Sequence, residues 1–577
     1  MHSDWRIPAI VLLILMVCAV SVIGQPTPSG DRRRPSVGFQ TRGRVMTRLG
    51  IVATSQTLAS QAGAQIMEQG GNAVDAAIAA NSVLGLVEPI SNGLGGDLFA
   101  IVYEAKTGKL YGLNASGWSP SGLTVEFLRK RGHRRMPQLG VYSVTVPGVV
   151  AGWDELRRRF GTMDFTALLR PAIYYAEQGF PVSERIAAGW QGSRRLLTRY
   201  PNAARTYLPD GRAPRAGDIF RNPDLARSLR VIAAKGRDGL YKGRLASAIV
   251  QVCKEEGGTM TPADLAEYQP EWVEPISTTY RGWTIYELPP NGQGIAALIM
   301  LNILEQFPLA RYGPNSAASL HTMIEAKKRA YADLMRYIGD PRFSKIPVQA
   351  LLSKQLAARR AKTIDPDRTQ DDVPPSELNE LTSKFGGDTI YMSAIDKDGN
   401  MVSLIQSNYA GFGSGLVPEG AGFMLQNRGA LFTLEERHPN TLAPRKRPLH
   451  TIIPAFMQRD DVRIAFGIMG GWNQAQAHAQ FVANVVDFGM NIQSAMEAPR
   501  FTKMTFGGLD VMLEPRIDSS TRADLERRGH RVQVLPVPYS GTVGGGQAVR
   551  RDKSGVNEAA SDPRKDGAAV PQGAPSN

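Results

Sequence analysis

A hydroxyl group that could act as a nucleophile stands at Thr389, where the character of the chain changes. The charged, Pro- and Ser-rich segment 357–387 ends in Gly386-Gly387, and Thr389 begins a predicted strand after Asp388. The glycines predict a flexible, exposed end of a linker that runs directly into this strand. Threonine is common at the start of strands, so this position alone is a weak signal of chemistry.

Several common catalytic sites are excluded by inspection. The sequence contains no H-E-x-x-H, no C-x-x-C, no G-x-x-x-x-G-K-[ST] and no serine in a G-x-S-x-G elbow. These absences disfavour a metalloprotease, a P-loop enzyme and an elbow-type esterase, and they leave no Ser-His-Asp triad to propose.

The run Gly292-Gln293-Gly294-Ile295-Ala296-Ala297 fits a loose dinucleotide-binding fingerprint between a predicted strand, 284–288, and a predicted helix, 295–307. The strand ends in Pro289-Pro290, and Pro308-Leu309-Ala310-Arg311 follows the helix in place of a second strand ending in a ribose-binding acid. We therefore interpret the glycines as a tight strand-to-helix turn and expect no dinucleotide cofactor.

The first part of the chain is predicted to be rich in helices. Apolar residues at helical spacing predict a helix at 57–69 that Gly70-Gly71 ends, and Asn72 is placed to cap a second helix at 74–87. The glycine-rich turn 92–96 then leads into a predicted strand. Further elements are expected as a strand at 98–103 and helices at 148–160, 164–178, 223–235, 244–256 and 316–338.

The pattern after the linker changes to paired strands. Predicted strands at 389–396 and 401–407 are joined by the turn Lys397-Asp398-Gly399-Asn400. A second strand pair is expected at 451–457 and 462–467, followed by a helix at 475–487. Helices early in the chain and paired strands later predict layered α/β packing around antiparallel sheets.

The composition is that of an ordinary globular protein. Of the 577 residues, 42% are apolar and 21% are charged, and the formal net charge is +14. The basic residues are spread along the chain, with no zinc-finger spacing or basic and aromatic module. We interpret the charge as a solvated basic surface and expect no nucleic-acid partner.

The N-terminus has the layout of a signal peptide, residues 1–24. An apolar run from Ile7 to Ile23 precedes Gly24 and a polar, Pro-rich sequence. An uncleaved anchor is the alternative, because this run is just long enough to span a bilayer. The Pro-, Gly- and Arg-rich residues 25–48 then predict a flexible leader, and the protein is expected to be exported, to the periplasm or the medium.

The two cysteines agree with this interpretation. Cys18 lies within the predicted signal peptide, so removal of that peptide leaves Cys253 alone and no intramolecular disulfide. Leu15-Met16-Val17 lacks the small residue expected before a lipidated cysteine, which favours a soluble exported protein over a lipoprotein.

Ordered motifs over about residues 47 to 565 resemble the γ-glutamyltranspeptidase family of N-terminal-nucleophile hydrolases. The matches in the first part include Glu68 to Ala77, Gly93 to Gly96, Val146-Pro147-Gly148, Tyr241-Lys242-Gly243, Ala330-Tyr331-Ala332-Asp333 and Gly339-Asp340-Pro341. Those in the second part include Gly413-Ser414-Gly415, Lys446-Arg447-Pro448-Leu449, Gly470-Gly471 and Ser561-Asp562-Pro563-Arg564.

The resemblance implies a four-layer αββα sandwich built from two chains after the precursor cuts itself. The break falls between Asp388 and Thr389, which gives a large chain, 49–388 after the leader, and a small chain, 389–577. The two chains form a heterodimer, and a disordered tail is expected from about residue 565. No cofactor or metal is implied.

The resemblance also gives roles to four residues of the small chain. Thr389 is implied to be the nucleophile, and its freed α-amino group, whose pKa is ordinarily about 8, serves as the general base. Ser407 matches the second hydroxyl that orients the nucleophile. The backbone N–H groups of Gly470 and Gly471 match the oxyanion hole.

The substrate pocket departs from the family pattern. The arginine that holds the glutamate α-carboxylate is matched by Ser116, and the groups that hold the α-amine are matched by Tyr409, Arg428 and Leu431. A serine pair that contacts the carboxylate becomes His450-Thr451. An acid is lost and an arginine is gained, and this resembles the subgroup of oxamate amidohydrolases and cephalosporin acylases.

Three functions follow from this resemblance. The first is a self-processing amidohydrolase or acyltransferase acting on a small carboxylate-bearing amide, with Arg428, Tyr409, His450 and Thr451 as substrate-binding residues. The second is a true γ-glutamyl transferase that hydrolyses glutathione or a related peptide. The third is a non-catalytic binding module, which the presence of Thr389 and both oxyanion glycines disfavours.

Overall fold

Two seven-stranded antiparallel sheets face each other in the computed structural model, which describes residues 40–376 and 388–575. Sheet I has the order β19 (Ala568–Pro571), β2 (Ile51–Thr54), β10 (Asp388–Ile395), β11 (Met401–Tyr409), β3 (Asp97–Glu104), β4 (Lys109–Ala115) and β7 (Glu271–Val273). Sheet II has the order β1 (Val45–Thr47), β18 (Asn557–Ser561), β17 (Gly546–Arg551), β13 (Val462–Ile468), β12 (Ala455–Arg459), β9 (Trp283–Glu287) and β8 (Ile276–Tyr280).

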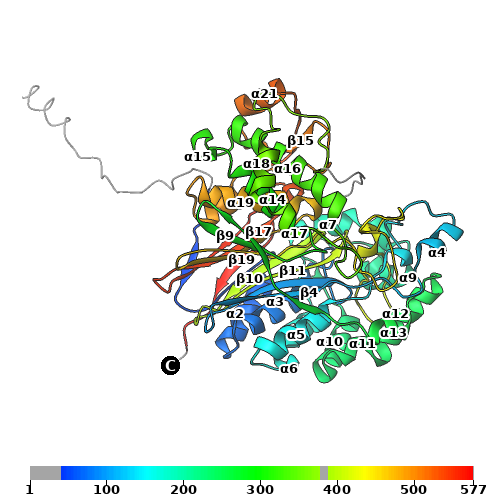
Figure 1. Cartoon of the computed structure of the whole chain (residues 1–577). Helices are drawn as coiled ribbons and strands as arrows, with labels where there is room; N and C mark the ends of the chain where they lie inside the picture. Colours follow the sequence, from blue (N-terminus) through cyan, green and yellow to red (C-terminus); the bar gives the residue numbers. More distant parts are fainter. Residues whose placement is uncertain (1–39, 377–387, 576–577) are drawn as a thin grey trace, which may run out of the picture. The chain divides into compact units, whose positions relative to one another are not determined.

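Helices cover the outer face of each sheet (Figure 1). Sheet I is covered by α2 (Thr57–Glu68), α3 (Ala73–Val87) and α5 (Val149–Phe160), with α6 (Phe165–Gln178) packed against α3 and α10 (Pro223–Lys235) packed against α6. Sheet II is covered by α14 (Gly294–Leu304), α19 (Gln474–Val486) and α20 (Ile492–Glu497), with α16 (Ala317–Tyr337) and α18 (Lys354–Ala361) packed against α14. The layers are therefore helices, sheet, sheet and helices, and the predicted αββα fold is confirmed.

Smaller helices and strands connect the elements of these layers along the chain. The further helices are α4 (Val125–Lys130), α7 (Glu184–Gly192), α8 (Arg194–Leu197), α9 (Pro201–Tyr207), α11 (Asp238–Tyr241), α12 (Gly243–Glu255), α13 (Pro262–Ala266), α15 (Leu309–Tyr312), α17 (Val348–Leu351) and α21 (Ser519–Arg527). The further strands are β5 (Phe180–Pro181) with β6 (Ile219–Phe220), and β14 (Phe501–Thr502) with β15 (Asp510–Leu513) and β16 (Arg531–Val534).

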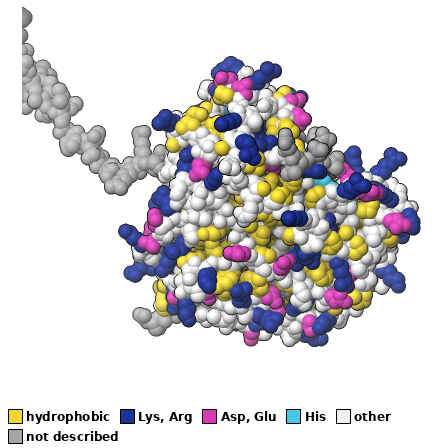
Figure 2. Space-filling view, viewed as in Figure 1, with side chains coloured by type: hydrophobic (Ala, Val, Ile, Leu, Met, Phe, Trp, Pro, Cys, Tyr) yellow, Lys and Arg dark blue, Asp and Glu magenta, His cyan; other side chains and the backbone are white. Residues whose placement is uncertain are grey.

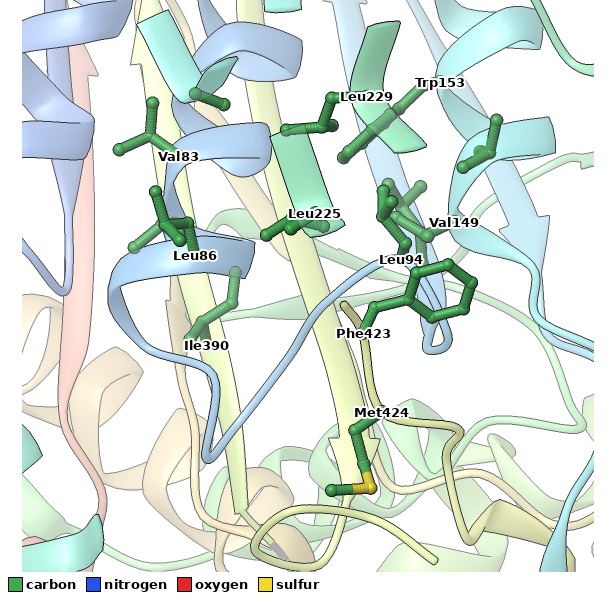
Figure 3. Packing of buried hydrophobic residues seen from close by; sticks show 14 of the residues in the cluster. Val83, Leu86, Leu94, Val149, Trp153, Leu225, Leu229, Ile390, Phe423 and Met424 are labelled. Atoms are coloured by element: carbon green, nitrogen blue, oxygen red, sulfur yellow. The ribbon is translucent and has the colours of Figure 1, made fainter. Parts of the chain in front are cut away.

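Helix α3 shows how the sequence builds the layer under the nucleophile. Asn72 accepts hydrogen bonds from the N–H groups of Val74 and Asp75, while the Asp75 carboxylate accepts the Asn72 N–H, which completes a capping box. All but one of its residues are buried, because small alanines let it lie between sheet I and α6. Its Leu86 belongs to the same core cluster as Ile390 of β10 (Figure 3).

The predicted helices and strands agree with the structure in most places. The helices expected at 148–160, 164–178, 223–235, 244–256 and 316–338 are α5, α6, α10, α12 and α16, each within two residues at its ends. The strand expected at 451–457 begins only at Ala455, so His450 and Thr451 precede the strand.

The ends of the ordered region differ from the expectation. The leader was expected to be flexible to residue 48, but β1 pairs with β18, and Thr41 donates its N–H and hydroxyl to the buried Glu497 carboxylate at 2.7 and 2.6 Å. The tail was expected to be disordered from about 565, but β19 pairs with β2 at the edge of sheet I. Backbone pairing outweighs the polar and proline-rich composition in both segments.

Other predictions fall wholly or partly outside the described residues. The predicted signal peptide and residues 25–39 of the leader lie outside them, as do residues 377–387 of the linker. The earlier part of that linker contains the end of α18. No helix within 40–376 and 388–575 is long and apolar enough to cross a membrane.

The basic residues are distributed over the visible face of the molecule. In Figure 2, Lys and Arg side chains are interspersed with Asp and Glu across that face. This distribution agrees with a solvated basic surface.

Removal of residues 567–577 should destabilise the protein. The deletion removes β19 and the bonds of Gln572 N–H to Gly50 O at 2.8 Å and Gly573 N–H to Glu68 Oε1 at 2.7 Å. At about 1 kcal/mol per hydrogen bond, we expect a loss of about 2 to 4 kcal/mol and a lower midpoint of thermal unfolding. Deletion of 574–577 alone is the control and should leave the midpoint unchanged. Equal midpoints for the two deletions would contradict an anchoring role for β19.

Candidate active site

A bulge in the pairing of β10 with β11 places Thr389. Asp388 pairs with Tyr409 and Ile390 pairs with Gln406, so Thr389 alone on β10 faces both Ser407 and Asn408 on β11. A bulge bends the strand locally and redirects a side chain from the regular alternation. Thr389 is buried, and its Oγ1 donates to Ser407 Oγ at 3.3 Å.

Ser407 connects the nucleophile candidate to the next strands of sheet I. Its Oγ also accepts the N–H of Tyr409 at 2.7 Å, and its backbone pairs with Asp97 at the start of β3. The structure therefore brings Thr389 and Ser407 together, as the family resemblance implied, and places Asp97 beside Ser407.

Gly470 and Gly471 form the loop between β13 and α19. Their φ angles are 122° and 59°, a left-handed pair that glycine adopts without strain. Within the described residues, neither N–H donates a hydrogen bond, so both donors remain for another acceptor. Gln474, four residues after Gly470, donates its Nε2 to Thr389 Oγ1 at 3.5 Å, which places the glycine loop next to the hydroxyl.

Gln293, the second residue of the rejected dinucleotide fingerprint, holds this loop in place. Its buried Nε2 donates to Gly471 O at 2.8 Å and to Thr451 O at 2.6 Å. Its backbone N–H donates to His450 O at 2.9 Å. One side chain from the turn before α14 thus fixes the glycine loop relative to the predicted substrate pocket. Sequence reasoning assigned this residue only to a turn.

The four residues predicted to bind substrate meet around Arg428. Its guanidinium is fully buried, its Nη1 donates to Thr451 Oγ1 at 2.7 Å, and its Cζ lies 4.7 Å from the centre of the Tyr409 ring. The Nη2 of Arg428 and the hydroxyl of Tyr409 are buried without a hydrogen-bond partner among the described residues. Burial lowers the pKa of Arg428 to about 10, so it stays charged at neutral pH.

Asp97 supplies the counter-charge that sequence reasoning missed. Its Oδ2 lies 3.4 Å from Arg428 Nε and 2.7 Å from His450 Nε2. Its Oδ1 accepts the Gly117 N–H at 2.7 Å and Gln426 Nε2 at 2.8 Å. The available signal was its position, since Asp97 directly follows the turn Gly93 to Gly96 in which the family resemblance was found.

His450 is neutral in this network. Burial, with Arg428 as the second cause, lowers its pKa to about 4. The Ile452 N–H donates to Nδ1 at 3.3 Å, which leaves the proton on Nε2 for the bond to Asp97. His450 therefore positions Asp97 and adds no charge to the pocket.

The two remaining pocket positions lie apart from Arg428. Ser116 is buried, and its Oγ accepts a hydrogen bond from Asn291 Nδ2 at 3.1 Å. Leu431 ends the short 3-10 helix η3 (Arg428–Leu431), where its carbonyl accepts Asn440 Nδ2. Neither position supplies a charged group.

A cleft with a volume of about 590 Å³ opens at Gly470. Charged side chains line it in two pairs, Lys565 with Glu88 at 2.8 Å and Arg185 with Asp566 at 3.8 Å. Its apolar lining comes from Ile90, Ile186, Ala188, Ala410, Met469 and Met504. The cleft offers an apolar surface with charges of both signs beside Gly470.

The described residues contain no group of three or more His, Cys, Asp or Glu side chains that could hold a metal ion. Cys253 is buried and unpaired, and burial raises its pKa to about 12, which makes it a poor thiolate nucleophile.

Comparison with known proteins gives consistent relatives. A family model described as gamma-glutamyltranspeptidase matches residues 59–572. The glutathione hydrolase-like YwrD proenzyme of Bacillus subtilis is 37% identical over 527 residues, covering 90% of this chain and 98% of that protein. The oxamate amidohydrolase proenzyme of Klebsiella pneumoniae is 35% identical over 531 residues, with the same two coverages. A crystal structure of cephalosporin acylase from Bacillus halodurans has a TM-score of 0.87 at 41% identity, covering 96% of this chain and 99% of that one.

The neutral state of His450 predicts a loss of stability in acid. The unfolded chain takes up a proton below a pKa of about 6.5, whereas folded His450 does so only near 4, so the free energy of unfolding falls as pH drops through this interval. We expect His450 to contribute about 2 kcal/mol of this loss by pH 5. Thermal unfolding of the wild type and of His450→Gln, each at pH 7.5 and pH 5, measures it. The variant should lose less stability on acidification, and equal losses would exclude His450 as a source.

Proposed function

Because the chain belongs to the γ-glutamyltranspeptidase family of self-processing N-terminal-nucleophile amidohydrolases, we propose that Thr389 is its nucleophile. The precursor is cut between Asp388 and Thr389, and the new α-amine of Thr389 becomes the general base. The hydrogen bond of Thr389 to Ser407, and the glycine pair with two unused N–H donors, support this assignment.

Maturation uses the same atoms as the later reaction. Thr389 Oγ1 attacks the carbonyl carbon of Asp388, the peptide C–N bond breaks, and the acyl group moves to Oγ1 as an ester. The same step frees the α-amine of Thr389, and water then hydrolyses the ester, which releases the C-terminal carboxylate of the large chain and restores the Thr389 hydroxyl. The strand pairs β10 with β2 and β11 with β3 join the two chains within one sheet, which supports a stable heterodimer.

In turnover, the α-amine takes the proton of Thr389 Oγ1 as this oxygen attacks the substrate amide. The N–H groups of Gly470 and Gly471 stabilise the tetrahedral oxyanion, and loss of one such donor typically costs about 3 kcal/mol. The protonated amine then donates to the leaving amine. Water, or an acceptor amine in a transfer reaction, releases the acyl group.

The acyl donor is a small amide that carries a carboxylate. The observation on which this rests is the buried Arg428, which lies over the Tyr409 ring and whose Nη2, like the Tyr409 hydroxyl, has no hydrogen-bond partner among the described residues. An arginine fork binds a carboxylate through two parallel hydrogen bonds. The oxamate amidohydrolase relative is consistent with such a donor.

A γ-glutamyl donor fits this pocket less well. Its α-ammonium needs a partner with negative charge, and Leu431 occupies the position where the family has an acid. Asp97 is the nearest carboxylate to Arg428, but it already accepts bonds from Gly117, Gln426 and His450. A buried ammonium without a partner would cost binding energy.

The leaving amine of the substrate lies in the cleft beside Gly470. The cleft has room for an amine with an apolar body, and its paired charges suit a peptide-like or zwitterionic group such as that of glutathione. We also propose that residues 1–24 are a signal peptide and that the enzyme works outside the cytoplasm.

The maturation step is tested with Thr389→Ala. Denaturing gels of the wild type should show two fragments, the smaller beginning Thr389-Ile390-Tyr391, whereas the variant should remain one inactive chain. N-terminal sequencing and an amide hydrolysis assay measure both outcomes. A wild-type protein that hydrolyses amides while remaining uncut would exclude this mechanism.

The acyl pocket is tested with Arg428→Ala. Removal of the fork should lower kcat/KM by at least about tenfold, or 1.4 kcal/mol, for both glutaryl and γ-glutamyl amides. In the wild type, glutaryl or shorter acid amides should match or exceed γ-glutamyl amides. Arg359→Ala, an exposed arginine of α18, is the matched control, and cleavage into two chains confirms that each variant folds. A preference for γ-glutamyl donors that survives in Arg428→Ala would overturn this pocket.

A further inference from the structure

Gln474 contacts the candidate nucleophile from α19, whereas Ser407 contacts it from β11. It is the first residue of α19 and is fully buried. Its Oε1 accepts the N–H of Ile453 at 3.1 Å, and its Nε2 lies 3.5 Å from Thr389 Oγ1. The side chain thus spans from a backbone donor to the hydroxyl oxygen.

The orientation of this amide is fixed by the backbone. Since the Ile453 N–H requires an acceptor, the carbonyl oxygen of Gln474 faces Ile453 and the NH₂ group faces Thr389. An NH₂ group donates and does not accept, so Gln474 cannot take the proton of the hydroxyl. It can only offer a hydrogen bond to a lone pair of Oγ1.

We propose that Gln474 is a further catalytic residue that stabilises negative charge on Thr389 Oγ1. The proposal rests on the role of Thr389 as nucleophile. When water attacks the acyl-enzyme, the α-amine takes one proton of that water, the acyl carbon to Oγ1 bond breaks, and Oγ1 receives the proton from the resulting ammonium. A donor on Oγ1 stabilises this oxygen while the bond breaks.

The bond to Ile453 does not by itself explain a glutamine. A glutamate would accept the same N–H, and its charge would be favourable in the first turn of α19, which contains no acidic residue. A carboxylate would, however, turn an acceptor toward Oγ1 and reverse the polarity of the contact. The neutral amide therefore matches a need for a donor at this oxygen.

Gln476, two residues further along α19, provides a matched control. It is equally buried, and its side-chain amide makes two hydrogen bonds with the backbone of Lys503. The Nε2 of Gln476 donates to Lys503 O at 3.1 Å, and the N–H of Lys503 donates to Gln476 Oε1 at 2.9 Å. It makes no contact with Thr389 among its hydrogen bonds to described residues. Loss of Gln476 thus tests the cost of removing a buried helix glutamine without touching the nucleophile.

The test compares Gln474→Leu, Gln474→Glu and Gln476→Leu with the wild type on a glutaryl amide that releases a coloured amine. In both Gln474 variants, deacylation should fall at least about tenfold, with a burst of amine and an acyl adduct on the small chain in mass spectra. In Gln474→Glu, the acid limb of the pH profile should also move to higher pH, because the carboxylate raises the pKa of the nearby α-amine. Gln476→Leu should show neither effect.

If a Gln474 variant does not mature, its self-cleavage still tests the proposal. The ester intermediate of maturation is attached to the same Oγ1, so it should accumulate in the variant. Hydroxylamine should cleave this ester and divide the precursor into the two fragments. Wild-type deacylation in both Gln474 variants, or an uncut precursor that resists hydroxylamine, would overturn the role of Gln474. An active, mature Thr389→Ala would instead overturn the proposed function itself.

Discussion

The position of β10 in sheet I is the constraint on which the site depends. This strand is hydrogen-bonded to β2 on one side and to β11 on the other, and its Ile390 is buried in the core cluster with Leu86 of α3 (Figure 3). The pairs with β2 begin only at Met392, so the start of β10 is held by β11 and by the packing of Ile390. At this start, Ser407 and Asn408 of β11 form a bulge opposite Thr389, and Ser407 and Gln474 contact Thr389 from two elements.

A second constraint is that buried polar groups must be paired, and this explains why residues from distant parts of the chain converge. Gln293 donates to two carbonyl oxygens, Gly471 O in the glycine loop and Thr451 O in the segment before β12. The same side chain therefore connects the proposed oxyanion loop to the proposed acyl-binding residues. A turn that resembles a nucleotide-binding loop in sequence here joins two parts of the candidate site.

Much of the fold could be predicted from sequence because its helices have clear periodicity and caps, as α3 has with Asn72 and Asp75. The site residues Thr389, Ser407, Gly470 and Gly471 could be named only through the family resemblance, and the structure brings Thr389, Ser407 and the glycine loop together. Asp97, Gln293 and Gln474 were missed, because a buried amide or acid has no local sequence pattern and its partners lie up to 353 residues away, as His450 does from Asp97. The tail 568–571 was missed for a related reason, since an edge strand is stabilised by its neighbour β2 and not by its own composition.

The electrostatics of the pocket follow from how Asp97 is satisfied. It accepts hydrogen bonds from Gly117, Gln426 and His450, whereas Arg428 Nε lies at 3.4 Å, beyond the usual length of a charged hydrogen bond. Arg428 can therefore turn its fork toward an incoming carboxylate without leaving Asp97 unpaired. Because His450 stays neutral, the negative charge of Asp97 offsets the positive charge of Arg428 before substrate arrives. This pairing is present in the folded protein and reduces the free-energy cost of burying the arginine. A carboxylate bound as we propose would replace only the weak contact of Nε with Asp97 and would accept from Nη2, which has no partner among the described residues, so the buried arginine can still act as a binding group.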